Sequence, residues 1–435
     1  MSNNSKAYER LTALFDDGIF TEIEPFAKSA EGEIEVAAGY GTVGGQFAYA
    51  FSQDSEVCGG AVTVAHCAKI KKVYDLAQKT GKPVIGIYDS NGVKLTEGFE
   101  VLSAYGEIVK ASARVSGVVP QISIIAGACI GTSALMANLA DVVIAVKEAD
   151  FYVTAPSEVT AQSSAENGVI DILADAFDSA VNSVKSLLPL LPENNLSIPV
   201  AYIDGENNAP VSADMDTKEL IAAISTQQYA VEFKADYTKS VVTSLAVIGG
   251  ETAGVIAFDG GAISPKAAYK AEAMLKLCDA FSLPVITFAN ADGFAKDCEA
   301  QMLTAATKLT SAYASATCPK ISLITKKAVG GAYITLAGKG ANADLTLAWD
   351  TAVVSPLDTD SAVAFLWNDR LADGEDRAAL EKEFNETIGS AYSAAACGAI
   401  DDVFTPDMTT QKLIGAIEML ISKRETTLPR KHSVK

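Results

Sequence analysis

Gly59-Gly60-Ala61 and Gly260-Gly261-Ala262 stand 201 residues apart, and each precedes an amphipathic helix that leads into an apolar strand. The strands that follow the two helices keep the same spacing. A repeat of this length has the size of a whole domain, not of one turn of a solenoid. The sequence therefore predicts two similar domains produced by duplication, which we place at residues 1–220 and 221–435.

A second pair of matching strands begins at Pro120 and at Pro319. Eleven residues after each proline comes a turn of small residues, Gly131-Thr132-Ser133 in the first copy and Gly330-Gly331-Ala332 in the second. Strands that alternate with helices, and that read as continuous apolar runs, are typical of parallel sheets covered by helices. We therefore expect both domains to be of the α/β class.

The composition favours an ordinary enzyme over a fibrous, disordered or nucleic-acid-binding chain. Of the 435 residues, 49% are hydrophobic and 7% aromatic. The net charge of −20 argues against nucleic acid as a partner, because phosphate binding needs clustered Lys and Arg. The sequence has neither a long apolar span nor an apolar signal core at its start, which favours a cytoplasmic protein. In an otherwise acidic chain, basic residues collect in the tail, at Lys423, Arg424, Arg430, Lys431 and Lys435.

Cysteine and histidine usage narrows the chemistry further. The seven cysteines include no C-x-x-C pair, so neither a disulfide framework nor a zinc site is expected. The chain has only two histidines, His66 and His432, which leaves little for a Ser-His-Asp hydrolase or a metal site. We expect His66 to be a packed or hydrogen-bonded core residue, and we expect no metal.

The two turns of small residues are the strongest candidates for catalysis. Each ends a buried strand and begins a helix, and the first N–H groups of a helix have no helical acceptor. Small residues let a substrate oxygen approach these donors, so each turn can hold a developing oxyanion. Tight packing of strand against helix also requires glycine, but two such turns at equivalent places favour a function.

Across nearly its whole length the chain resembles the carboxyltransferase component of biotin-dependent acyl-CoA carboxylases. This family includes the β-type subunits of propionyl-CoA and acetyl-CoA carboxylases and the α subunits of glutaconyl-CoA and methylmalonyl-CoA decarboxylases. The resemblance lies in Gly39-Tyr40-Gly41-Thr42-Val43, Phe51-Ser52-Gln53-Asp54, Lys82-Pro83-Val84-Ile85-Gly86, Ser116-Gly117-Val118-Val119-Pro120-Gln121-Ile122-Ser123, Gly260-Gly261-Ala262-Ile263-Ser264-Pro265, Lys327-Ala328-Val329-Gly330-Gly331-Ala332-Tyr333, Lys423-Arg424-Glu425 and Pro429-Arg430-Lys431-His432.

The resemblance implies two tandem crotonase-like (ClpP/crotonase) domains built from ββα units stacked as a spiral. It also implies that Gly131 and Thr132 hold the thioester oxygen of an acyl-CoA, and that Gly331 and Ala332 hold the ureido oxygen of biotin. Carboxybiotin would release CO2, the freed biotin nitrogen would take the substrate α-proton, and the enolate would attack CO2. Further binding residues are expected at Gly92, Val93, Lys94, Gly330 and Tyr333.

Further chains are implied as partners. Biotin is expected on a separate carrier protein, and a biotin carboxylase or a membrane decarboxylase subunit supplies the activities that this chain lacks. Family members assemble as homo-oligomers, here expected to be hexamers, in which the first domain of one chain faces the second domain of another. A decarboxylase pump would hold the chain at the periphery of a membrane.

Some positions depart from the family pattern. Thr132 stands where the family has a second glycine, and the loop that usually ends in arginine reads Ser90-Asn91-Gly92-Val93-Lys94. Ile334 replaces an acid tied to acyl choice. A non-catalytic subunit that scaffolds an active paralogue is therefore an alternative, and the direction of transfer stays open. A crotonase-type hydratase or isomerase is disfavoured because no paired glutamates lie near the first turn.

Two further side chains are assigned from the helical pattern. We expect Glu97 to cap the helix over about 97–114 rather than to act as a base. We expect Lys69 to lie on the outer face of the helix over about 61–79, together with Lys71, Lys72 and Lys79.

Overall fold

The structure is a computed structural model, and it describes residues 5–29, 32, 34–154, 157–199, 209–341 and 343–426. The tail motif over 429–432, with Arg430, Lys431 and His432, and Lys435 beyond it, lies outside the described residues. Contacts divide the chain into two compact units, Met1–Val200 and Ala201–Lys435. This division comes earlier than the predicted boundary after residue 220, which would cut helix α7 (Thr217–Ile224) in two.

The first unit is built on one mixed sheet, in the strand order β1-β2-β3-β5-β7-β8-β10, with β9 beside β7. β1, β2 and β3 pair antiparallel, and the later strands pair parallel. The bounds are β1 (Phe20–Glu22), β2 (Val36–Val43), β3 (Gln46–Gln53), β5 (Val84–Ser90), β7 (Gln121–Ile130), β8 (Val142–Val146), β9 (Phe151–Tyr152) and β10 (Ile172–Ala174).

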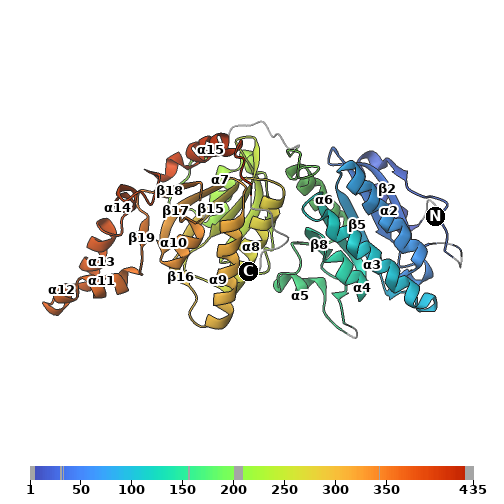
Figure 1. Ribbon diagram of the computed structural model, residues 1–435, viewed down its shortest axis with the longest axis horizontal. Helices are drawn as coiled ribbons and strands as arrows, with labels where there is room; N and C mark the ends of the chain where they lie inside the picture. The colour runs from blue at the N-terminus through green and yellow to red at the C-terminus, as the bar shows by residue number, and fades with distance from the viewer. Residues whose placement is uncertain are drawn as a thin grey trace. The chain divides into compact units, whose positions relative to one another are not determined.

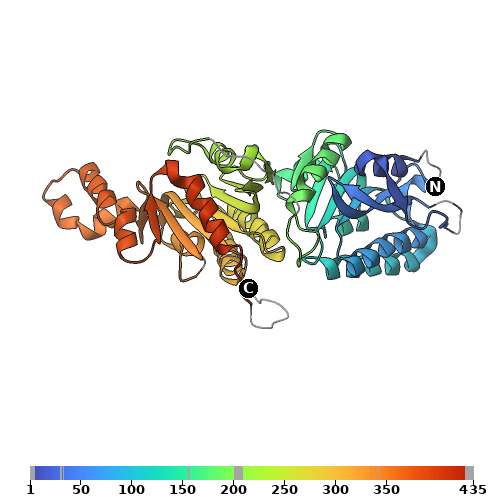
Figure 2. The ribbon, with the colours of Figure 1, turned by 90° about the horizontal axis from the view of Figure 1, so that it is seen from above.

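Helices cover both faces of this sheet, which is why its central strand β5 is buried along its whole length (Figures 1 and 2). α2 (Val64–Thr80) and α3 (Gly98–Val115) pack together on one face, and α1 (Lys6–Leu14) and α6 (Phe177–Leu187) lie on the other. The remaining helices of the unit are short: α4 (Thr132–Ala137) and α5 (Ala161–Glu166).

The second unit repeats this plan in the order β11-β12-β13-β15-β17-β18-β20, with β19 beside β17. α8 and α9 pack together like α2 and α3, while α7 and α15 take the places of α1 and α6 (Figure 1). The register repeats as well, since Val285 pairs with Lys320 as Val84 pairs with Gln121. The predicted duplication and the α/β class are therefore confirmed. The bounds are β11 (Ala230–Phe233), β12 (Val241–Ile248), β13 (Glu251–Phe258), β15 (Val285–Ala291), β17 (Lys320–Val329), β18 (Leu345–Trp349), β19 (Val353–Ser355), β20 (Asp402–Phe404), α8 (Pro265–Ala280), α9 (Glu299–Ser315), α10 (Gly331–Leu336) and α15 (Thr409–Leu420).

Three helices are added between β19 and β20 of the second unit: α11 (Thr359–Leu366), α12 (Asn368–Ala372) and α13 (Arg377–Glu386). The helix that follows them, α14 (Ala391–Ala396), is the counterpart of α5. Buried side chains of α11 and α13, among them Val363, Leu380 and Phe384, form a small core of their own. In the part of the chain that the structure describes, no helix has the length and apolar character needed to cross a bilayer.

Candidate functional site

The two predicted turns adopt the same backbone geometry. Gly131 (φ 63°, ψ −128°) precedes α4, and Gly330 (φ 53°, ψ −124°) precedes α10. Positive φ at these positions favours glycine over residues with a side chain. The N–H of Gly131 donates to the Tyr152 carbonyl at 2.9 Å, and the N–H of Gly330 donates to the Ser355 carbonyl, also at 2.9 Å. Gly131 is therefore the structural equivalent of Gly330.

Free donors begin one residue later. The carbonyls of Gly131 and Gly330 accept the first helical bonds, from Leu135 and Ile334, each at 3.3 Å. Within the described ranges, no acceptor is found for the amides of the two residues after each glycine, Thr132 and Ser133 in the first unit and Gly331 and Ala332 in the second. Because the β9 strand already accepts the Gly131 N–H, the donors that the first turn leaves without a described acceptor are those of Thr132 and Ser133.

A short parallel ladder lies against each turn. In the first unit, β4 (Ala61–Val62) pairs with β6 (Gly92–Val93), and β6 contacts α4. The Lys94 N–H donates to the Val62 carbonyl at 2.8 Å, and the Gly92 N–H donates to Ser90 Oγ at 3.2 Å. Gly92 thus has no free amide for a ligand. Val93 lies opposite Val62, so its own amide faces the other side of the ladder.

The second unit has the same ladder, in which β14 (Ala262–Ile263) pairs with β16 (Gly293–Phe294). A Cβ added at Gly331 would lie 3.0 Å from Cε2 of the Phe294 ring, so the ring closely covers that glycine. Tyr333, predicted to bind, donates its hydroxyl to the Ala399 carbonyl at 3.0 Å, and partial burial raises its pKa. This bond anchors α10, and the hydroxyl is not free to meet a ligand.

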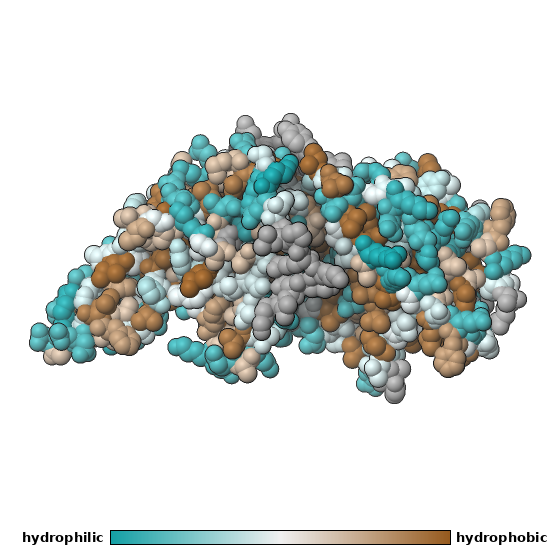
Figure 3. Space-filling model, viewed as in Figure 1, coloured by the Kyte–Doolittle hydropathy of each residue, from teal (hydrophilic) through white to brown (hydrophobic). Residues whose placement is uncertain are grey.

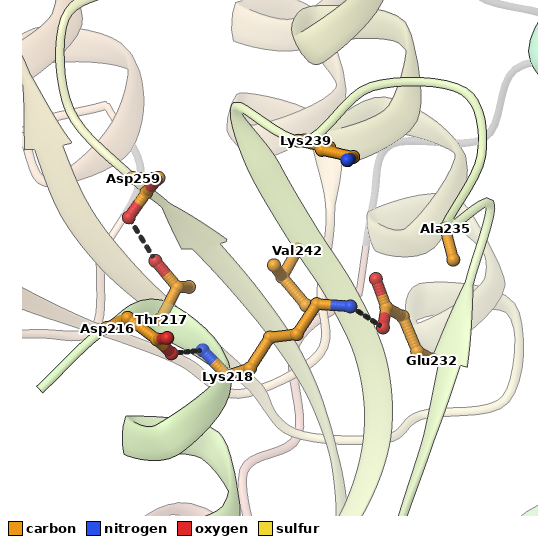
Figure 4. A pocket seen from close by; sticks show the side chains of 8 residues that line it. All are labelled: Asp216, Thr217, Lys218, Glu232, Ala235, Lys239, Val242 and Asp259. Carbon is orange, nitrogen blue, oxygen red and sulfur yellow. Dashed lines mark hydrogen bonds and ion pairs between the residues drawn. The ribbon is translucent and has the colours of Figure 1, made fainter.

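A cavity of 560 Å³ adjoins the second turn through Phe294, which lines it. Two exposed lysines, Lys296 and Lys327, also line the cavity, and Lys327 forms an ion pair with Asp292 at 3.1 Å. Five acids line the same cavity, so it combines an aromatic surface with two lysines and a larger number of carboxylates: Asp292, Asp297, Asp358, Asp360 and Glu381. A different cavity, of 280 Å³, lies at the start of α7 and is lined by an ion pair between Lys218 and Glu232 (Figure 4). It includes no residue of either turn.

His66 and Glu97 both have structural roles. His66 is completely buried between Gln53 (3.2 Å) and Glu35 (3.4 Å), and its burial lowers its pKa, so the prediction of a hydrogen-bonded core histidine is confirmed. Glu97 accepts the Val64 N–H at 2.5 Å and so caps α2. The prediction that it caps its own helix is wrong, because the 3-10 turn over Leu95–Glu97 directs the carboxylate to the neighbouring helix. Among the described residues, no group of three metal-binding side chains converges.

Comparisons with known proteins agree with this architecture. A model of the carboxyl transferase domain matches residues 2–434. The chain is 32% identical to the methylmalonyl-CoA decarboxylase subunit alpha of Veillonella parvula, over 98% of this chain and 92% of that protein. It is also 32% identical to the propionyl-CoA carboxylase beta chain of Saccharopolyspora erythraea, over 98% of this chain and 89% of that protein.

The crystal structure of transcarboxylase 12S, described as a hexamer with methylmalonyl-CoA and methylmalonic acid bound, matches 99% of this chain and 93% of its own. The TM-score is 0.92 and the identity 29%. The predicted fold of two tandem crotonase-like units is thereby confirmed.

Proposed function

This chain belongs to the carboxyl transferase domain family, and from that premise we propose that it transfers a carboxyl group between biotin on a separate carrier protein and a short-chain acyl-CoA. The observation that carries the proposal is the duplicated turn. In each copy the glycine N–H donates to a neighbouring strand. The amides of the next two residues have no acceptor in the described part of the chain.

The two turns serve two different oxygens. The amides of Thr132 and Ser133 hold the thioester oxygen, whose negative charge grows when the α-carbon of the acyl group becomes an enolate. Fixed amide dipoles favour this state over the neutral thioester, and they therefore lower the barrier rather than only binding substrate. Val93, whose amide faces away from its ladder, lies beside the same turn and adds a further donor.

The second turn fits the ureido group of biotin. The amides of Gly331 and Ala332 have no acceptor in the described part of the chain, and the Phe294 ring, which packs against Gly331, gives an apolar surface that also lines the 560 Å³ cavity. Biotin supplies or accepts the carboxyl group through a ureido nitrogen. The amides of the chain stabilise negative charge on the ureido oxygen, so the transfer needs no side-chain base from the protein.

The relatives suggest the setting of the reaction. The similar proteins are named as subunits of acyl-CoA carboxylases and decarboxylases, and one of them is described as a hexamer. This chain accordingly works as a homo-oligomer, of six copies, in the cytoplasm. It acts with a biotin carrier and with a biotin carboxylase or a membrane decarboxylase subunit. Lys94, which follows β6 directly, supplies a point charge for a phosphate of coenzyme A.

Turnover of a carboxylated acyl-CoA tests the proposal. Purified chain is incubated with free biotin and methylmalonyl-CoA or malonyl-CoA, and the CoA esters are followed by mass spectrometry. Biotin-dependent release of propionyl-CoA or acetyl-CoA is expected. Calorimetric titration with acetyl-CoA runs in parallel. If no short carboxyacyl-CoA is turned over while the chain neither binds CoA esters nor assembles alone, the scaffold alternative holds and the enzymatic proposal fails.

A further inference from the structure

Three buried hydroxyls form a chain behind the first turn. The Tyr105 hydroxyl lies 2.8 Å from Ser133 Oγ, and Ser133 Oγ lies 3.5 Å from Ser90 Oγ. Ser90 in turn donates to the Gly60 carbonyl at 2.7 Å. Both serines have no exposed surface, and Tyr105 is 2% exposed. The chain therefore joins α3, α4 and the end of β5 without contact to solvent.

The hydrogen bonds of this chain can run in only one direction. A serine hydroxyl has one proton, and that of Ser90 goes to the Gly60 carbonyl. Ser90 must then accept from Ser133, and Ser133 must accept from Tyr105. Burial raises the pKa of Tyr105, so its hydroxyl keeps the proton that it donates.

The same chain also reaches the short ladder beside the turn. Ser90 Oγ accepts the Gly92 N–H at 3.2 Å, and Gly92 precedes Val93 in β6. Ser133 itself is the second residue of α4 and bears one of the free amides. One hydroxyl network thus connects the two groups of donors that face the proposed acyl-CoA oxygen.

The duplicate copy forms its turn without this network. Ser90 ends β5, and its counterpart at the end of β15 is Ala291. Ser133 corresponds to Ala332, the second residue of α10. The backbone bonds of the two glycines are nevertheless the same in length in both units. In the second unit a different hydroxyl pair, Thr310 Oγ1 and Thr335 Oγ1 at 2.8 Å, joins α9 to α10. The hydroxyl chain that runs from the helix to the end of the neighbouring strand is therefore a feature of the first copy, and it points to a task specific to that copy.

We propose that Ser133 is a positioning residue for carboxyl transfer, which fixes the amides of α4 relative to the amide of Val93 through the hydroxyl chain from Tyr105 to Ser90. This inference rests on the proposed function of the first turn. Donors that are held rigidly favour the enolate more than the thioester, since the charge on oxygen is larger in the enolate. Loss of the hydroxyl chain should then lower kcat and leave binding of the CoA ester unchanged.

The test compares Ser133→Ala, Tyr105→Phe and the double variant with the wild-type chain, in the biotin-dependent decarboxylation of methylmalonyl-CoA. We expect Ser133→Ala to lower kcat about tenfold, with the same Kd for acetyl-CoA in calorimetry. If the hydroxyls act as a unit, Tyr105→Phe costs nothing further in the Ser133→Ala background. Ser112→Ala is the matched control. Ser112 lies on α3, is buried like Ser133, and donates its hydroxyl to Gln121 at 2.7 Å, outside the chain from Tyr105 to Ser90. It should leave kcat unchanged.

The outcomes separate the two proposals. An inactive wild-type chain overturns the proposed function and this inference with it. An active wild type with an equally active Ser133→Ala variant overturns only this inference. The same holds if Ser133→Ala loses kcat only in proportion to lost folded protein, measured by its thermal unfolding, or if Ser112→Ala loses as much.

Discussion

Thr132 occupies the first position of α4, where a helix tolerates proline because the N–H has no helical acceptor. Gly131 before it has φ 63° and ψ −128°, the mirror image of the extended conformation that residues before proline prefer, and glycine adopts it freely. Thr132→Pro therefore removes the amide proton and the threonine side chain while the backbone keeps its conformation. We expect kcat to fall by about 10²–10³, measured by decarboxylation of methylmalonyl-CoA with free biotin.

Thr132→Ala is the control for this change, since alanine keeps the N–H and loses the same branched side chain. It should stay within a few-fold of the wild-type rate. Equal rates for the proline and alanine variants would show that the Thr132 amide does not meet the reacting oxygen.

Gly331 gives a complementary prediction for the second turn. An added Cβ would lie 3.0 Å from the Phe294 ring, and the ring must move to admit it. Gly331→Ala should reduce biotin-dependent turnover while the Kd for acetyl-CoA stays that of the wild type, because the acyl-CoA turn lies in the other unit. A weaker acetyl-CoA affinity in Gly331→Ala would contradict this division of roles.

At this scale the sequence predicted two equivalent turns but not which amides in them lack an acceptor. The spacing of eleven residues after Pro120 and Pro319 already aligned Gly131 with Gly330, as the structure has them. The family resemblance instead paired Gly131-Thr132 with Gly331-Ala332, one residue out of register. Consecutive glycines in the second copy hide which of them takes the positive φ, and only the acceptors at Tyr152 and Ser355 decide it.

Among the elements, α2 and α8 show what periodicity misses. Lys69 was expected on the outer face of α2, yet it is 2% exposed and donates to the Glu24 carbonyl at 3.2 Å. The equivalent lysine of α8, Lys270, is 1% exposed and donates to the Thr238 carbonyl at 3.0 Å. Each helix face is covered by a segment distant in sequence, which a helical pattern cannot reveal. The repeat could have indicated that this lysine is buried, since Lys69 and Lys270 occupy the same position in the two copies.

Lys270 makes the stability of the second unit depend on pH. Burial lowers its pKa from 10.5 to about 8. Between these values the unfolded chain binds more protons than the folded chain, so the free energy of unfolding rises with pH from about 8 to 10.5, by at most about 3 kcal/mol. Lys270→Met removes this gain. Urea unfolding at pH 7, 8 and 10 should show the wild type improving relative to the variant.

Lys79 provides the comparison for this measurement, because it is an exposed lysine near the end of α2. Lys79→Met should keep the pH dependence of the wild type. A Lys270→Met variant whose stability follows the wild type at all three pH values would show that Lys270 stays charged when folded.

For the whole molecule, the sequence predicted the duplication but not the helices that are inserted into the second copy. Two copies with the same strand order follow from spacings fixed by Pro120 and Pro319. The group α11–α13 interrupts the second copy with a small core around Phe384 and an ion-pair cluster in which Arg370 meets Glu375 and Glu383. These helices have no counterpart in the first copy, so the repeat could not predict them.

Exposed apolar side chains and net charge act in opposite directions on assembly. Phe99 on α3 is 88% exposed and Phe365 on α11 is 78% exposed. Figure 3 shows apolar side chains gathered over α3 and α4, where Leu102 and Leu135 also reach the surface. Such patches mark sites of protein association. Each copy also has a net charge of −20, so bringing six copies together is opposed by their repulsion.

Salt should therefore strengthen the proposed hexamer. The screening length falls from about 30 Å at 0.01 M to about 8 Å at 0.15 M salt, which weakens repulsion between copies while apolar contacts persist. Sedimentation at micromolar concentration should show species smaller than six 45.3 kDa chains at the lower ionic strength and the hexamer at the higher. Phe99→Ser should shift the distribution toward smaller species at both ionic strengths, because it removes apolar area and leaves the charge unchanged. Dissociation on adding salt would instead mean that ion pairs between copies, rather than these apolar patches, hold the assembly.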